Sequence, residues 1–176
     1  MNAIVILCGG NACGKTTTIE SFFHNRFSYT NNGKKFFERT LDGKKVYCVD
    51  SGSPQERNKF CHVEDVNANI QMRTDECNKK ANGQSYVLII PFTMSVSSLD
   101  RTKLNEDCIL KPIERLRKTF NVFVIYLKKT NARNLDKKNA LMQKIAMIDI
   151  ETTDKDFDKS AELEAFLRKN VIKTLS

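Results

Sequence analysis

Apolar runs of strand length recur along the chain and alternate with polar or amphipathic segments. The longest lie at residues 3–8, 85–92 and 122–127, and a shorter one follows at residues 146–150. Continuous apolar runs of this length, rich in β-branched side chains, are typical of strands buried on both faces of a parallel sheet. We therefore expect these segments to form the centre of such a sheet.

Helical periodicity fills the segments between these strands. Ile19, Phe22 and Phe23 share one face of a helix that starts near residue 15. The other expected helices are one or two within residues 55–80, ended by a turn at 81–83, one that begins near residue 99 and is broken or restarted at Pro112, a short one at 135–145, and a last one at 160–175. This alternation predicts a three-layer, doubly wound α/β fold with ligands at the carboxyl ends of the strands.

A hairpin is expected to add one antiparallel edge strand to this mostly parallel sheet. An Asp-Gly pair at residues 42–43 lies between strand-like runs at 36–41 and 44–49, which is a strong signal for a tight hairpin turn. The polar stretch at residues 28–33 is predicted as a loop. The second hairpin strand ends at Asp50, which a cluster of turn residues follows.

The segment between the first strand and the first helix matches a phosphate-binding loop. Residues 9–16 fit the pattern G-x-x-x-x-G-K-[ST] at every fixed position. Glycines allow positive φ and a close approach to phosphates, and the N–H groups of the loop and helix point at the anion. The residues expected to contact nucleotide here are Gly9, Gly10, Asn11, Ala12, Cys13, Gly14, Lys15, Thr16 and Thr17.

Lys15, Thr16 and Asp50 supply the charge and metal chemistry of the expected site. Lys15 is predicted to reach the β- and γ-phosphates, and the Thr16 hydroxyl to ligate Mg²⁺. Asp50 stands at the carboxyl end of an apolar strand, where it can hold the hydration shell of the same ion. The alternative for Asp50 is an aspartate that starts a turn or caps the next helix.

Composition describes an ordinary globular chain. Its 176 residues, 40% hydrophobic and 28% charged, suit a single P-loop NTPase domain over residues 1–176. No apolar run reaches membrane-spanning length, and the N-terminus lacks the basic region of a signal peptide. The six cysteines form no C-x-x-C pair, so buried or reduced thiols are expected rather than a disulfide framework, which favours the cytoplasm.

The net charge of +8 does not by itself indicate nucleic-acid binding. The lysine pairs are scattered over separate segments, and no basic stripe interleaved with aromatic residues is present. A solvated basic surface that attracts anionic partners non-specifically explains the charge better than a specific nucleic-acid site. Cys61 and His62 are adjacent but lack a second ligand pair, so they give little support to a metal site.

The order of these elements resembles that of the Ras-like small GTPases over nearly the whole chain. The resemblance implies that Thr30 closes on Mg²⁺ and the γ-phosphate, and that Gln55 orients the attacking water. Residues 50–57 are similar to the D-x-x-G-Q-E segment of the family. Residues 151–155 are similar to its E-T-S-A-K base loop, which places Thr152 and Thr153 beside the nucleotide.

The sequence departs from the family in two motifs. Gly52 comes two residues after Asp50 rather than three, and Gln55 five rather than four, as if one residue were inserted. The N-K-x-D guanine loop falls on residues 128–131, where Lys129 can stack along the base but Asn131 replaces the bidentate aspartate. The base is therefore left open between GTP and ATP.

Three functions are compatible with these observations. The leading one is a Ras-like switch that binds Mg²⁺ and a nucleoside triphosphate, hydrolyses it slowly with the help of Lys15 and Gln55, and signals to a protein effector or regulator. The second is a P-loop kinase for a nucleotide or another small molecule, in which Arg57, Arg73 and Arg133 clamp the acceptor. The third is a nucleotide-binding module with weak or no turnover.

Overall fold

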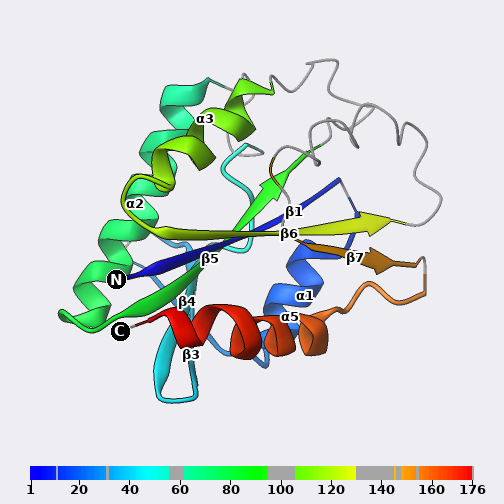
Figure 1. The fold of residues 1–176 in the computed structure, drawn as a ribbon, viewed down its shortest axis with the longest axis horizontal. Coiled ribbons are helices and arrows are strands. Elements are labelled where there is room, and N and C mark those ends of the chain that lie inside the picture. The colour runs from blue at the N-terminus through cyan, green and yellow to red at the C-terminus, as the bar shows by residue number, and fades with distance from the viewer. Residues whose placement is uncertain are drawn as a thin grey trace.

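The chain folds around one seven-stranded sheet, shown in Figure 1. The coordinates are a computed structural model that describes residues 1–10, 12–30, 32–55, 62–94, 106–129, 145, 148–153 and 155–175. The strand order is β2-β3-β4-β5-β1-β6-β7. The strands are β1 (Ala3–Gly9), β2 (Phe27–Tyr29), β3 (Lys35–Leu41), β4 (Lys44–Val49), β5 (Tyr86–Thr93), β6 (Asn121–Lys129) and β7 (Ile148–Thr152).

Helices cover both faces of the sheet, which confirms the doubly wound α/β class (Figure 1). The described helices are α1 (Lys15–Phe22), α2 (Val63–Ala81), α3 (Asp107–Leu116) and α5 (Ser160–Phe166), which continues as a π-helical turn (Leu167–Val171) and a 3-10 turn (Ile172–Thr174). None of these helices is long and apolar enough to cross a membrane.

Alternate residues of β1 belong to two separate hydrophobic cores, one on each face of the sheet. Ile4, Ile6 and Cys8 pack with α2 and α3, whereas Val5 and Leu7 pack with α1 and α5. This two-sided burial explains why the strand is apolar at every position rather than at every second one. It also fixes β1 at the centre of the domain, where its carboxyl end can carry a site.

The hairpin forms at residues 42–43 as predicted. Asp42 and Gly43 both have positive φ, 50° and 75°, which is the conformation that a two-residue turn matching the strand twist requires. β3 is antiparallel to β4 and to β2. The loop expected over 28–33 is thus wrong at its start, because Ser28 and Tyr29 pair with β3 as part of a short edge strand.

Two other expectations also require correction. Lys128 and Lys129 belong to β6, where they pair with β7, and not to a polar loop. Pro112 neither ends α3 nor opens a new helix but lies inside it. The helices expected near residue 99 and at 135–145 fall largely outside the described residues, so only Ile145 of the second is described as helical.

β4 and β5 diverge towards their carboxyl ends. β1 pairs with β5 as far as Gly9 and Thr93, but β4 pairs with β5 only from Lys45 to Tyr47. Pro91 follows in β5, beyond the last β4 partner. The two strands therefore form a fork that opens at the edge where the phosphate loop lies.

The sheet order also separates β4 from β1. β5 lies between them, so the strand that ends at Asp50 is not a direct neighbour of the phosphate-loop strand.

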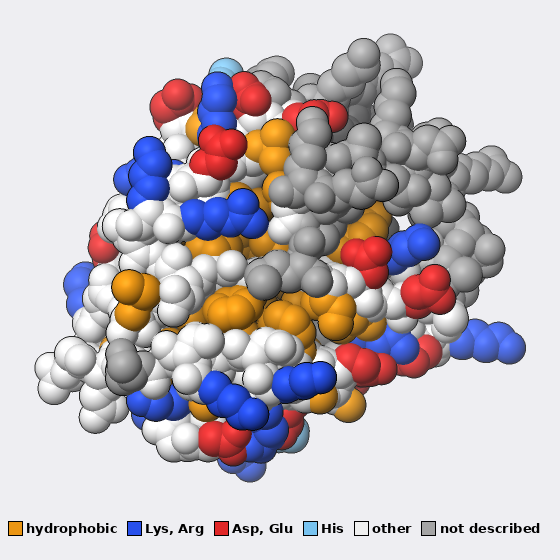
Figure 2. All heavy atoms as spheres, in the orientation of Figure 1, with side chains coloured by type: hydrophobic (Ala, Val, Ile, Leu, Met, Phe, Trp, Pro, Cys, Tyr) orange, Lys and Arg blue, Asp and Glu red, His pale blue; other side chains and the backbone are white. Residues whose placement is uncertain are grey.

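On the face shown in Figure 2, lysine and arginine side chains form several separate groups with acidic side chains nearby, as the scattered lysine pairs of the sequence suggest.

Candidate functional site

The phosphate loop turns sharply at the carboxyl end of β1. A Cβ atom on Gly9 would lie 2.2 Å from Cys13 Sγ and 3.0 Å from the Leu127 carbonyl oxygen, so a larger residue would fit only if Cys13 moved. Gly14 has a φ of 89°, and a Cβ atom there would lie 2.2 Å from the Phe157 carbonyl oxygen. Both glycines are thus favoured by a close approach of other residues, and not only by the motif.

Lys15 is folded into this loop. Its side chain is buried, and its ammonium donates to the carbonyl oxygens of Gly9 at 3.1 Å and Gly10 at 2.8 Å. Thr16 and Thr17 are exposed at the start of α1. The positive charge of Lys15 and the first N–H groups of α1 therefore lie at one place, as anion binding requires. Asn11 lies outside the described residues.

Asp50 lies across the fork from this loop. It has a left-handed φ of 66° at the end of β4, its side chain is buried, and its Oδ1 accepts a hydrogen bond from the Gly52 N–H at 3.0 Å. The next carbonyl, of Ser51, lies 3.5 Å from Thr16 Oγ1. The structure therefore brings the Asp50 turn and Thr16 together, although β5 separates their strands.

This pair offers the hard oxygen donors that suit Mg²⁺. A hydroxyl and one carboxylate are a typical protein contribution for this ion, because it keeps several waters and also binds substrate phosphates. Among the described residues, no group of three or more His, Cys, Asp or Glu side chains could hold a metal by itself. The donor set thus fits a magnesium ion shared with phosphates better than an all-protein metal centre.

Thr30, the third expected metal ligand, lies in the turn between β2 and β3. Its N–H donates to the Lys34 carbonyl at 2.7 Å, and its hydroxyl accepts from the Lys34 N–H at 3.2 Å. β2 is four places from β1 in the sheet, which corresponds to about 19 Å at the usual strand spacing. Thr30 lies at the correct edge of the sheet, but the structure does not bring it to the phosphate loop.

Gln55 has a structural role in this conformation. Its side chain is 4% exposed, its Nε2 donates to the Cys108 carbonyl at 3.2 Å, and its Oε1 accepts from the Thr93 N–H at 3.4 Å. Pro112 explains the first bond: it has no N–H to donate to the carbonyl four residues earlier, which is that of Cys108. Gln55 takes the place of the missing helical donor.

Arg73 of α2 is the largest fully buried side chain of the described chain. Its guanidinium donates to the main-chain carbonyls of Asp50 and Gly52 and does not reach solvent. Burial of this kind removes Arg73 from the acceptor clamp considered with the kinase function. Arg57 and Arg133, the other two residues of that clamp, lie outside the described residues.

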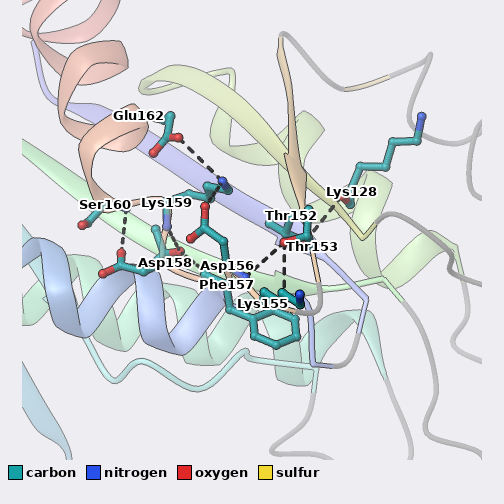
Figure 3. A network of polar contacts seen from close by, with 11 residues as sticks. Lys128, Thr152, Thr153, Lys155, Asp156, Phe157, Asp158, Lys159, Ser160 and Glu162 are labelled. Carbon is teal, nitrogen blue, oxygen red and sulfur yellow. Dashed lines mark hydrogen bonds and ion pairs between the residues drawn. The ribbon is translucent and has the colours of Figure 1, made fainter.

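The expected base loop is built by β6, β7 and the residues that follow (Figure 3). The buried Thr152 hydroxyl donates to the Lys128 carbonyl at 3.4 Å, and the Thr153 hydroxyl accepts from the Asp156 N–H at 3.1 Å. Both side chains therefore stabilise the loop itself. Asn131 lies outside the described residues.

Phe157 is the residue of this region that the motifs did not indicate. The Lys129 ammonium lies 5.4 Å from the centroid of its ring, and the Phe157 carbonyl accepts from the Thr18 hydroxyl of α1 at 3.2 Å. The ring is partly exposed beside the phosphate loop. The available sequence signal was an aromatic residue between Lys155 and Lys159, five positions after the end of β7.

The described thiols do not form a reactive site. Cys8, Cys13, Cys48 and Cys77 are free and buried, as expected. Burial raises the pKa of Cys8 and of Cys48 to about 12, so both stay protonated and unreactive at neutral pH. Cys108 is disulfide-bonded, which differs from the expectation of reduced thiols.

Comparison with known proteins adds little to this picture. No protein-family model and no curated protein matches the chain. Among solved structures, it is similar to the cytosolic domain of the T. maritima FeoB iron transporter in its GMPPNP form, with 16% sequence identity and a TM-score of 0.40 over 96% of this chain and 63% of that one. A likeness of this degree carries no argument about function. The functional interpretation therefore rests on the chain's own features, a mostly parallel α/β sheet with the G-x-x-x-x-G-K-T motif at the carboxyl end of its central strand.

Proposed function

We propose that residues 1–176 form one domain that binds a nucleoside triphosphate with Mg²⁺ and hydrolyses it slowly. The observation that carries this proposal is the position of Lys15, whose buried ammonium lies inside a loop in which other residues approach two glycines closely. The loop amides and Lys15 would hold the phosphates and stabilise charge on the transferred phosphoryl group.

Thr16 and Asp50 are the residues that would hold Mg²⁺. When bound, the ion neutralises charge on the β- and γ-phosphates, which is its usual contribution to phosphoryl transfer. Thr30 can join this set only if the turn between β2 and β3 moves towards the loop. Such a movement would give the nucleotide state a readout for a protein effector or regulator. The cytoplasmic location expected from the sequence remains a prediction.

For the base, we propose stacking rather than a hydrogen-bond code. The ring of Phe157 and the ammonium of Lys129 lie together beside the phosphate loop. Base–aromatic stacking tolerates any base, because every base has a π-face. Either GTP or ATP therefore fits, and contact of the base with Thr152, Thr153 and Asn131 stays a prediction of the sequence.

Phosphoryl transfer to an acceptor is a second candidate. Gln55 could orient an attacking water only after its amide leaves Cys108 and Thr93. Transfer to an acceptor hydroxyl needs no glutamine to orient a water, so it is compatible with the buried, hydrogen-bonded Gln55. This observation favours transfer over a Gln55-dependent hydrolysis; a binding module without turnover is the remaining alternative.

Calorimetric titration of ATP and GTP, with Mg²⁺ and with EDTA, tests nucleotide binding. Lys15→Ala should lose the roughly 1.5–3 kcal/mol of a charged hydrogen bond, whereas Lys44→Ala, at the half-buried start of β4 beside the hairpin turn, should bind like the wild type. Equal affinities of Lys15→Ala and the wild type would refute the site. Phosphate release without any acceptor supports hydrolysis, whereas transfer of the γ-phosphate to an added nucleoside monophosphate, with no release of inorganic phosphate, supports the kinase.

A further inference from the structure

Arg73 is a cation with no exposure to solvent, and both terminal nitrogens of its guanidinium bond one short turn. Its side chain is 0% exposed. Nη1 donates to the Asp50 carbonyl at 2.9 Å, Nη2 donates to the Gly52 carbonyl at 2.8 Å, and Nε donates to Asn69 Oδ1 at 2.8 Å on its own helix. Because a guanidinium stays charged when buried, these bonds compensate for the loss of water.

The turn that Arg73 binds is not one that the chain adopts easily. Asp50 has a φ of 66°, a left-handed conformation that non-glycine residues rarely occupy. The planar fork of Arg73 holds the carbonyls on both sides of Ser51, and this fixes the turn from the α2 side. The Asp50 N–H is fixed from the β3 side, since it donates to the Lys35 carbonyl at 2.7 Å.

The rest of the segment is attached to the fork between β4 and β5. Ser53 Oγ donates to Thr93 Oγ1 at 2.8 Å, and Gln55 bonds the Thr93 N–H and the Cys108 carbonyl. Ser51, Ser53 and Gln55 are all buried. Residues 50–55 are thus held by α2, β5 and α3, and the Ser51 carbonyl presented to Thr16 is part of this fixed segment.

We infer that Arg73 is a positioning residue that holds Asp50 ready for Mg²⁺ before nucleotide binds, and that residues 50–55 keep their conformation through the nucleotide cycle. The metal role rests on the proposed function; the fixed conformation does not. In terms of regulation, this segment is a static part of the site. Any nucleotide-dependent movement must then come from another part of the chain.

Hydrogen–deuterium exchange of the full chain tests the fixed conformation. Amides within residues 50–55 should exchange slowly in the wild type, with the same rates without nucleotide and with Mg²⁺–ATP or Mg²⁺–GTP. Arg73→Lys keeps the charge but loses the fork, so exchange there should rise about tenfold or more. Arg117→Lys, on the exposed end of α3, is the matched control and should leave the rates unchanged. A large nucleotide-dependent change in the wild type, or unchanged rates in Arg73→Lys, would overturn the inference.

Titration with and without Mg²⁺ separates positioning from a general loss of stability. Arg73→Lys should weaken binding in Mg²⁺ by about tenfold and leave binding in EDTA unchanged; an equal loss in both conditions would show that Arg73 only supports the fold. If Arg73→Lys does not fold, Asn69→Ala removes only the Nε acceptor and should change both readouts in the same direction. If the wild type binds no nucleotide and Lys15→Ala makes no difference, the proposed function and the metal role fail together, and the exchange rates still decide whether the segment is fixed.

Discussion

The side-chain amide of Gln55 donates to the main-chain carbonyl of Cys108, across the gap between the Asp50 segment and α3. This carbonyl would normally bond the N–H four residues later in the helix, but that residue is Pro112. One side chain thus lets a proline lie inside a helix without leaving a buried carbonyl unsatisfied. It also attaches the segment beside the phosphate loop to the opposite layer of the domain.

The bond predicts an energetic coupling between Gln55 and Pro112. Gln55→Ala should lower the free energy of unfolding by about 0.5–1.5 kcal/mol, because it removes the hydrogen bond that the Cys108 carbonyl accepts from Gln55. In a Pro112→Ala background the helix regains its own donor, so the same substitution should cost less. Urea unfolding of the two single variants and the double variant gives the coupling, which should be about 0.5–3 kcal/mol. Additive effects would show that Gln55 does not serve the proline.

Gly14 and Gly33 provide a matched pair for the phosphate loop. Both have positive φ, 89° and 71°, but a Cβ atom on Gly14 meets the Phe157 carbonyl whereas a Cβ atom on Gly33 meets nothing within 4 Å. Gly33→Ala should therefore cost only the left-handed strain, about 1–2 kcal/mol. Gly14→Ala should cost more and also impair nucleotide binding. Equal losses of stability would show that the contact with Phe157 is easily relaxed.

Phe157 should contribute to the binding of the base and not of the phosphates. Phe157→Leu is expected to weaken ATP and GTP binding by about 1–3 kcal/mol, the value of one stacked base, and to leave inorganic triphosphate binding unchanged. Phe27→Leu is the control, since Phe27 also lies under a lysine, with Lys35 Nζ 4.6 Å from its ring, but on the edge strand β2. Equal weakening of nucleotide and triphosphate would instead indicate a packing role for Phe157.

Buried thiols predict a loss of stability at alkaline pH. The pKa of Cys48 is raised by burial from 9.0 to about 12, so the unfolded chain loses this proton at lower pH than the folded chain. Stability should therefore be complete below pH 9 and fall between pH 9 and 12, with a slope of roughly 1.4 kcal/mol per pH unit for each such group. Cys48→Ala should make this slope shallower in urea unfolding across that range. An unchanged slope would show that Cys48 does not titrate on unfolding.

Local patterns predicted much of the fold because they depend on neighbouring residues only. The phosphate loop and the turn at Asp42 need particular backbone angles, and glycine or aspartate at a fixed spacing predicts these angles. β1 was predictable because both of its faces are buried. The short strand β2 was not, since Ser28 and Tyr29 form it only by pairing with β3.

The site was less predictable because its geometry depends on contacts between distant segments. The position of β5 between β1 and β4 cannot be read from chain order, and it decides how the turn after Asp50 reaches Thr16 through the Ser51 carbonyl. Arg73 and Gln55 look like surface polar residues in the sequence. Arg73 is buried because it bonds the strained turn at Asp50. Gln55 is buried because it bonds the Cys108 carbonyl, 53 residues away, to which Pro112 cannot donate.

Pro91 has a consequence for the shape of the whole edge. Alternate N–H groups of a strand point to the same side, so Pro91 faces the side on which Thr93 bonds Gln55, where β4 would otherwise continue its pairing. A proline has no N–H to offer a neighbouring strand. β4 therefore cannot resume its pairing with β5 at this position, and one imino acid helps to keep the two strands apart beside the phosphate loop.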